Sequence, residues 1–174
     1  MRRARSVFSF PNPVNEVAAR VVAGGVVLLS LLAIGLGAVG QGWPLLLLAV
    51  GFWARVLTGP TLSPLGQLAV RVVAPRIAPP KYVAGPPKRF AQAMGVAFSS
   101  TALVLWFGLG YQTAALVVVG MLLGAAFLES AFAYCLGCKV FALLMKAGVI
   151  PARVCEECAD VSLRHPELRD PVAV

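Results

Sequence analysis

The sequence predicts an all-α polytopic membrane protein with four transmembrane helices arranged as two hairpins, with short interfacial helices and a cytosolic C-terminal cysteine module. Of its 174 residues, 59% are hydrophobic and 13% are charged, which is too apolar for a soluble domain of this length. Two stretches, 21–54 and 90–128, contain no Lys, Arg, Asp, Glu or His. Each is nearly twice the roughly 20 residues that cross a bilayer, so each is expected to fold back on itself. A soluble bundle of two buried hairpins is disfavoured, because both faces of each helix are apolar.

The first hairpin is expected over residues 13–59, after a cytosolic N-terminal arm at 1–12. Asn12 followed by Pro13 predicts a helix cap and a first turn. Glu16 and Arg20 are four residues apart, the spacing of an ion pair on one helical face. The Gly, Gln and Pro residues of "GAVGQGWP" predict the turn of this hairpin near 40–44.

Residues 60–89 are expected to form a cytosolic loop rich in Pro and cations. Ser63 and Pro64 predict the start of a short helix, and the spacing of the apolar residues after them fits a helix that lies on the inner membrane surface. The run from 74 onward contains too many Pro residues for regular structure, so the third membrane helix is expected to start near Phe90. The cations of the loop could also form a pocket that binds an anion or a lipid headgroup.

The second hairpin is expected over residues 90–134, with its turn near 108–112 in "FGLGYQT". Its second helix carries Gly120 and Gly124 in a G-x-x-x-G pattern. Small residues at this spacing let two helices approach closely, either within the bundle or between copies in a homo-oligomer.

Two ionisable residues lie close to membrane-type runs. Arg55 follows Pro44 by only eleven residues in the second helix, and Glu129 is near the end of the fourth. Charged groups at such depths usually face protein or water. We expect Arg55 and Glu129 to pair at the cytosolic face, with a functional acid at Glu129 as the alternative.

The distribution of cations predicts the orientation in the membrane. Lys and Arg occur before the first hairpin, between the hairpins and after the second, whereas neither hairpin turn has a charge. The positive-inside rule therefore places both termini and the central loop in the cytosol, in a multi-pass protein of the inner (plasma) membrane. The net charge of +8 is mostly explained by this topology. Nucleic acid is not expected as a partner, because no basic stripe alternates with aromatic stacking residues.

All four cysteines lie in the module at 135–174, as two C-x-x-C pairs separated by sixteen residues. The pairs are Cys135 with Cys138 and Cys155 with Cys158. This spacing is typical of a tetrahedral zinc site, provided that the helix expected between the pairs returns the second pair to the first. Disulfides are disfavoured in the reducing cytosol.

Dithiol chemistry is the second interpretation of the cysteines, and an iron–sulfur cluster is a third. A reactive thiolate needs a helix N-terminus or a nearby cation. Lys139 adjoins Cys138, whereas Glu156 and Glu157 surround the second pair with negative charge. The first pair, Cys135 and Cys138, is therefore the better nucleophile.

The segments "FPNPVNEVAAR", "GPTLSPLGQLAVR", "GPPKRFAQAMG" and "CLGCKVFALLMKAGVIPARVCEEC" together resemble the bacterial membrane family catalogued as domain of unknown function 4395. The likeness extends over roughly residues 8–160. It implies a small four-helix membrane protein, and it implies partners of thioredoxin-like or thiosulfate sulfurtransferase type. The family motif falls here on Asn12, Asn15, Arg20, Arg89, Cys135, Cys138, Cys155 and Cys158.

These observations predict an integral membrane protein with a cytosolic four-cysteine site that acts in thiol redox or sulfur handling. Zinc is the candidate metal for this site. One alternative is a transporter or channel subunit for a small sulfur compound, since Gln92, Ser99 and Trp106 recur every seven residues and could line a path beside Glu129. Another is a scaffold that docks a soluble partner. The sequence contains no nucleophile, base and acid trio, so it leaves open whether the protein is an enzyme.

Overall fold

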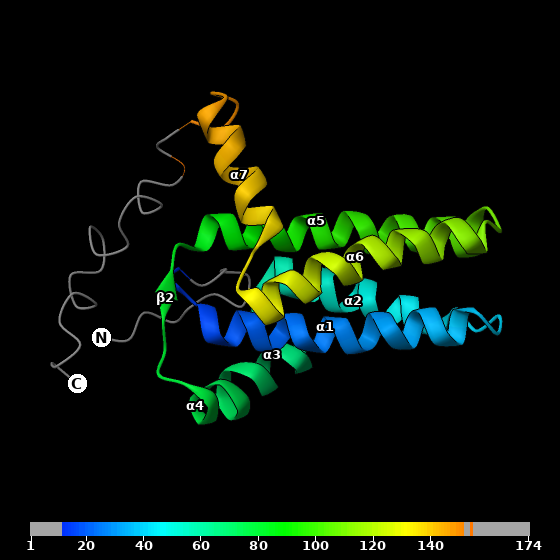
Figure 1. The fold of residues 1–174 in the computed structure, drawn as a ribbon, viewed down its shortest axis with the longest axis horizontal. Helices are drawn as coiled ribbons and strands as arrows, with labels where there is room; N and C mark the ends of the chain where they lie inside the picture. The colour runs from blue at the N-terminus through cyan, green and yellow to red at the C-terminus, as the bar shows by residue number, and fades with distance from the viewer. Residues whose placement is uncertain (1–11, 152–153, 155–174) are drawn as a thin grey trace, which may run out of the picture.

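In a computed structural model of the chain, which describes residues 12–151 and Val154, four helices pack into an elongated bundle (Figure 1). They are α1 (Glu16–Gly37), α2 (Trp43–Thr58), α5 (Gly85–Leu103) and α6 (Gln112–Phe132). A π-helical turn, η2 (Val104–Gly108), extends α5. α1 packs mainly against α6, and α2 packs mainly against α5; the bundle is closed by contacts between α5 and α6 and between α1 and α2.

Three helices of the described part are long and apolar enough to cross a membrane, which confirms an all-α, membrane-type architecture. They are α1, α5 with its extension, and α6. α2 is apolar but has only 16 residues, a length of about 24 Å at 1.5 Å per residue. That is shorter than the roughly 30 Å hydrocarbon core, so a fourth full span stays a prediction.

Many large apolar side chains point out of the bundle, as expected of helices surrounded by lipid. Leu28 is 69% exposed, Val50 66% and Met121 58%. Inside the bundle, bulky aromatic rings pack against glycine. The Phe52 ring lies where a side chain on Gly95 would be, because a Cβ atom there would sit 2.1 Å from the ring. Trp106 packs in the same way over Gly42.

The two hairpin connections lie at the same end of the bundle (Figure 1). They cover residues 38–42 and 109–111, near the turns predicted at 40–44 and 108–112. The opposite end, called the basic end below, holds the N-termini of α1 and α5, the C-termini of α2 and α6, and the short helices described next. Every Lys and Arg of the described residues lies on the segments at this end.

The central loop contains a short helical arm beside α1. As predicted, the Ser63 side chain accepts a hydrogen bond from the Gly66 amide and Pro64 begins the helix. The arm runs through α3 (Pro64–Leu68), the π-helical η1 (Ala69–Val73) and α4 (Ala74–Ile77). Leu65 packs against α1 at Gly25, where a Cβ atom would lie 2.5 Å from the leucine side chain.

The expected start of α5 near Phe90 was wrong. The helix begins five residues earlier, at Gly85, because proline is well tolerated in the first turn of a helix and Pro86 and Pro87 occupy that turn. A short pairing that the sequence did not predict lies just before it: β1 (Val14–Asn15) runs antiparallel to β2 (Tyr82–Val83). This pairing fixes the start of α1 beside the start of α5.

The expected N-cap of α1 was also wrong. Asn15, rather than Asn12, caps α1 by accepting a hydrogen bond from the Val17 amide at 3.0 Å. The Asn12 side chain instead accepts the Gly85 amide of α5 at 2.9 Å. Because α5 has no cap of its own from the preceding residue, Asn12 satisfies one of the free amides at its N-terminus from a distant part of the chain.

The predicted pair of Glu16 with Arg20 does not form. The Glu16 carboxylate lies 2.8 Å from the Lys81 ammonium, across the β1–β2 pairing. Arg20 donates to the carbonyl oxygens of Ser130 and Ala131 at 3.1–3.2 Å. A cation at these carbonyls stabilises the C-terminal end of α6, where backbone acceptors are otherwise unpaired.

Candidate functional site

The first cysteine pair lies where the chain leaves α6 and starts a new helix, α7 (Leu136–Lys146), which projects from the bundle at an angle (Figure 1). α6 ends with Ala133 in the left-handed conformation. Cys135 is the N-cap of α7, and its sulfur accepts a hydrogen bond from the Cys138 amide at 3.3 Å. Both thiols are therefore at the N-terminus of a helix, whose partial positive charge favours an anion.

At Gly137, the start of α7 packs closely against α5. A Cβ atom at Gly137 would lie 2.5 Å from the Ala91 Cβ and 2.6 Å from its Cα, a distance that no real side chain tolerates. Further along α7, the buried Phe141 ring packs against Phe90 at 5.6 Å between centroids. The position of the thiols relative to the bundle is thus set by close packing between α7 and α5.

The predicted pair of Arg55 with Glu129 is wrong. Glu129 binds Lys88, with 2.8 Å between the carboxylate oxygen and the ammonium nitrogen, and both side chains are largely buried. Lys88 lies on the first turns of α5, next to the cysteines. The sequence reasoning missed Lys88 because it counted this residue among the loop cations. The two prolines before Lys88 were the feature that could have placed it on a helix.

Arg55 lies on the last turn of α2, where it is 5% exposed. Its Nε atom donates to the side-chain oxygen of Gln92 at 3.1 Å, and its guanidinium carbon lies 4.5 Å from the centre of the Phe52 ring. Arg55 therefore faces α5 with a neutral partner rather than an acid.

The two thiols of the first pair have opposite tendencies to ionise. A hydrogen bond from the Cys138 thiol lowers the pKa of Cys135; the nearby Lys88 charge and the Cys138 amide act in the same direction, against burial and the Glu129 charge. The same shared hydrogen bond, together with burial and the Cys135 charge, raises the pKa of Cys138. Cys135 is therefore the more acidic thiol of the pair, and a shared proton is held more strongly by Cys138.

Both sulfurs line a cavity of about 460 Å³ at the basic end, which we call the thiol hollow. It is also lined by Glu16, Lys88 and Lys139. Cys135 is 7% exposed, so little of its side chain is at the outer surface.

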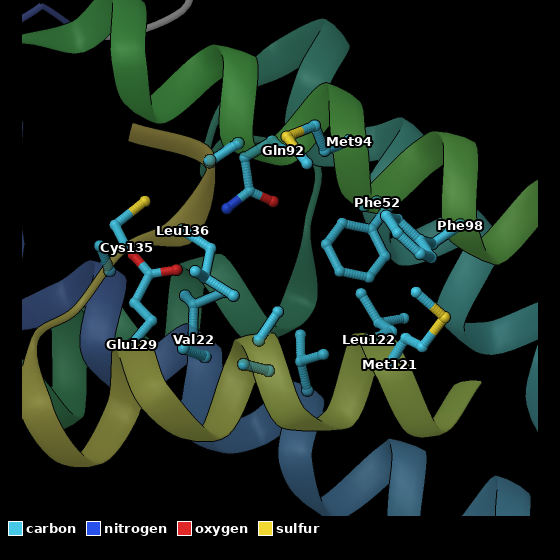
Figure 2. A pocket seen from close by; sticks show the side chains of 18 residues that line it. Val22, Phe52, Gln92, Met94, Phe98, Met121, Leu122, Glu129, Cys135 and Leu136 are labelled. Atoms are coloured by element: carbon cyan, nitrogen blue, oxygen red, sulfur yellow. The ribbon is translucent and has the colours of Figure 1, made fainter. Parts of the chain in front are cut away.

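Cys135 also lines a second cavity, of about 200 Å³, between α1, α5 and α6, which we call the inner cavity (Figure 2). Glu129, Gln92 and Cys135 lie towards one end of it, and Phe52, Phe98 and Leu122 lie towards the other. Cys135 thus lines both the thiol hollow and the inner cavity, whereas Cys138 lines only the thiol hollow.

The path suggested for transport is not formed by the three residues proposed to line it. Gln92 lines the inner cavity. The Ser99 hydroxyl donates within its own helix to the carbonyls of Gly95 and Val96. Trp106 is buried in the core against α1 and α2. Only Gln92 of the three therefore faces the cavity that contains Glu129.

The remaining candidate residues are spread over the basic end and the outer face. Asn12, Asn15 and Arg20 support helix termini, and Arg89 is exposed on α5 and lines a further hollow with Asn12 and Phe141. Added Cβ atoms on Gly120 and Gly124 would meet nothing within 4 Å. The G-x-x-x-G pattern therefore makes no helix contact within the described chain.

Cys155 and Cys158 lie outside the described residues, so a site of four thiolates stays a prediction. Within the described ranges, no group of three or more His, Cys, Asp or Glu side chains is placed to hold a metal ion. Cys135 and Cys138, two of the four predicted ligands, are free thiols.

A family model described as "Domain of unknown function (DUF4395)" matches residues 14–146. The match covers the four-helix bundle and α7 with the first cysteine pair, and it ends before the second pair. No curated protein and no solved structure matches the chain.

Proposed function

The chain belongs to the DUF4395 family, and we propose that this member is a membrane dithiol protein whose Cys135 and Cys138 exchange electrons with a partner disulfide at the cytosolic face. The observation that carries the proposal is the unequal pair of thiols at the N-terminus of α7. A nucleophilic thiolate beside a protonated thiol is the arrangement that thiol–disulfide exchange requires.

The proposed reaction has two steps. The Cys135 thiolate attacks one sulfur of the partner disulfide, which forms a mixed disulfide and releases the first partner thiolate. The Cys138 thiol then loses its proton and attacks the Cys135 sulfur, which releases the second partner thiol and leaves a Cys135–Cys138 disulfide. Two electrons pass to the partner, so a cellular dithiol must later reduce the pair.

The proposed partner is a soluble protein of thioredoxin-like or sulfurtransferase type. Lys139 lines the thiol hollow, and its positive charge would attract an acidic surface around the partner's sulfur. The cytosolic placement follows from the positive-inside rule applied to the basic end. A purely scaffolding role would need neither the proton sharing between the thiols nor a cavity that reaches Cys135.

The experiment is disulfide trapping with protein in nanodiscs and an oxidised thioredoxin-type partner. We expect Cys138→Ser to accumulate a stable mixed disulfide, because the second step is blocked. Cys135→Ser should form none. The double variant Cys155→Ser/Cys158→Ser is the matched control and should exchange as the wild type does. Equal trapping by both single variants would contradict the assigned roles.

Zinc binding by all four cysteines is the second candidate. It is supported by the course of the chain after α7, where Gly148 adopts a positive φ and Ile150 packs back against Phe141. Val154 lines one hollow with Phe90 and Phe141, so the chain just before Cys155 returns to the α5–α7 interface. Elemental analysis separates the candidates, because zinc held by four thiolates would be lost from Cys155→Ser/Cys158→Ser, whereas exchange by the first pair would persist.

A further inference from the structure

Arg55 carries a buried charge without an acidic partner among the described residues. The structure describes two acids, and each is bound elsewhere: Glu16 to Lys81 and Glu129 to Lys88. The only hydrogen bond of the Arg55 side chain in this part of the chain runs from Nε to the neutral Gln92. A guanidinium has five N–H donors, so its two terminal nitrogens still have donors to offer.

A buried cation is costly unless a counter-charge and further hydrogen bonds compensate it. Solvent offsets little of this cost, since Arg55 is only 5% exposed. The stacking on Phe52 and the bond to Gln92 instead hold the guanidinium in one orientation. Such a fixed, planar set of donors is suited to an anion with two adjacent oxygens.

Arg55 lines a cavity of about 360 Å³ at the basic end, between the start of α1, the end of α2, the α3 arm and α5. Lys88 and Gln92 lie on the same wall. Because Glu129 already neutralises Lys88, the cavity has one uncompensated positive charge. The other walls are mostly apolar and include Ala18, Val22 and Val70.

We propose that this cavity binds a single oxyanion group of the phosphate or sulfate type, held by the Arg55 guanidinium, either as a free ion or as the headgroup of an anionic lipid. The inference rests on Arg55 and its cavity and does not depend on cysteine chemistry. The apolar walls would contact the body of a lipid or an organic anion, whereas the guanidinium would bind its charged oxygens.

The test measures thermal unfolding in detergent against increasing phosphate or sulfate, with chloride as the reference at constant ionic strength. A second arm compares nanodiscs of phosphatidylglycerol with nanodiscs of phosphatidylcholine. A specific anion stabilises the folded state in a saturable way. Stabilisation by free phosphate or sulfate identifies an ion site, and stabilisation by phosphatidylglycerol alone identifies a lipid headgroup.

Arg55→Gln should weaken the apparent anion affinity by at least about tenfold, the effect of losing a charge-assisted hydrogen bond. Gln92→Glu is the second variant. It keeps Arg55 but supplies an internal carboxylate beside Nε, so it should abolish the anion response while the protein stays folded. Arg71→Gln is the control, because it removes the same charge from an exposed site at the basic end.

Cys135→Ser/Cys138→Ser should keep the full response, which separates this inference from the proposed dithiol function. The proposal is overturned if the wild type responds to none of the anions or lipids. It is equally overturned if Arg71→Gln weakens the response as much as Arg55→Gln does, since the effect would then be general charge screening.

Discussion

Cys135 and Cys138 are three positions apart, yet their surroundings make them chemically unequal. The Cys135 sulfur accepts a hydrogen bond from the backbone amide of Cys138, and interaction with the Cys138 thiol lowers the pKa of Cys135. The Lys88 charge favours the anion as well, although Glu129 neutralises part of it. In the proposed exchange, this inequality makes Cys135 the attacking sulfur and Cys138 the sulfur that resolves the mixed disulfide.

The pH dependence of alkylation tests this inequality at the two sulfurs. Because the pKa of Cys135 is lowered and that of Cys138 is raised, Cys135 should react with iodoacetamide at lower pH than an ordinary cysteine of pKa about 8.5, and Cys138 only at higher pH. Cys138→Ser removes the thiol hydrogen bond and should shift the Cys135 profile upward. The measurement is mass spectrometry of each labelled site, with Cys155 and Cys158 replaced by Ser. A faster reaction at Cys138 would reverse the assignment.

At the scale of elements, α7 is the support of the thiols, and its position depends on a glycine contact. Gly137 lets the backbone of α7 lie against Ala91 of α5, and the Phe90–Phe141 contact holds the next turns. The same helix α5 provides Lys88 and Gln92. The thiols, the ion pair and the Arg55 cavity are therefore linked through one helix.

Gly137→Ala tests the role of this contact. The added methyl group would overlap Ala91, so we expect a loss of about 1–3 kcal/mol in unfolding free energy, as for other overpacked sites. It should also slow alkylation of Cys135 by moving α7 away from Lys88. Gly124→Ala is the matched control, because a Cβ atom there meets nothing within 4 Å. The unfolding free energy of both variants is measured by denaturant unfolding followed by tryptophan fluorescence. Similar losses in Gly137→Ala and Gly124→Ala would show that the contact with Ala91 does not contribute specifically to stability.

At the scale of the whole molecule, the bundle has two unlike ends. One holds the two uncharged connections, and the other holds every described cation, the thiol hollow and the Arg55 cavity. The outward-facing apolar side chains between these ends have no covering segment in the described chain. A bilayer around the middle of the bundle would leave the first cysteine pair and the Arg55 cavity on the basic side.

Topology labelling tests this arrangement in spheroplasts, with the native cysteines replaced by Ser. Gln41→Cys and Tyr111→Cys should react with an impermeant maleimide from outside, because they lie on the two connections. Leu62→Cys should react only after lysis, since it lies on the connection between the C-terminus of α2 and α3 at the basic end. If positions 41 and 62 label from the same side, α2 does not cross the bilayer. That result would also be consistent with its 16-residue length.

How much the sequence predicts depends on whether a feature is local. The hairpin connections, the Ser63 and Pro64 helix start and the short helix after the first cysteines follow from neighbouring residues, and the structure has them near the expected positions. The partners of Asn12, Glu16, Arg20 and Glu129 were all misjudged. Each of these side chains binds a segment that is distant in the sequence, and only the packing of the helices decides which segment that is.

By itself, therefore, the sequence determined that the apolar helices form two hairpins. Uncharged runs favour an apolar environment, and Gly and Pro end helices, so both features depend only on neighbouring residues. The tertiary structure alone decided that Glu129 binds Lys88 and that Arg55 is left with Gln92. Both cations lie at the same end of the bundle, so charge pattern cannot choose between them. The rotation and register of α5 between α2 and α6 bring the Lys88 ammonium to the Glu129 carboxylate and leave Arg55 bonded to Gln92 at the wall of a cavity.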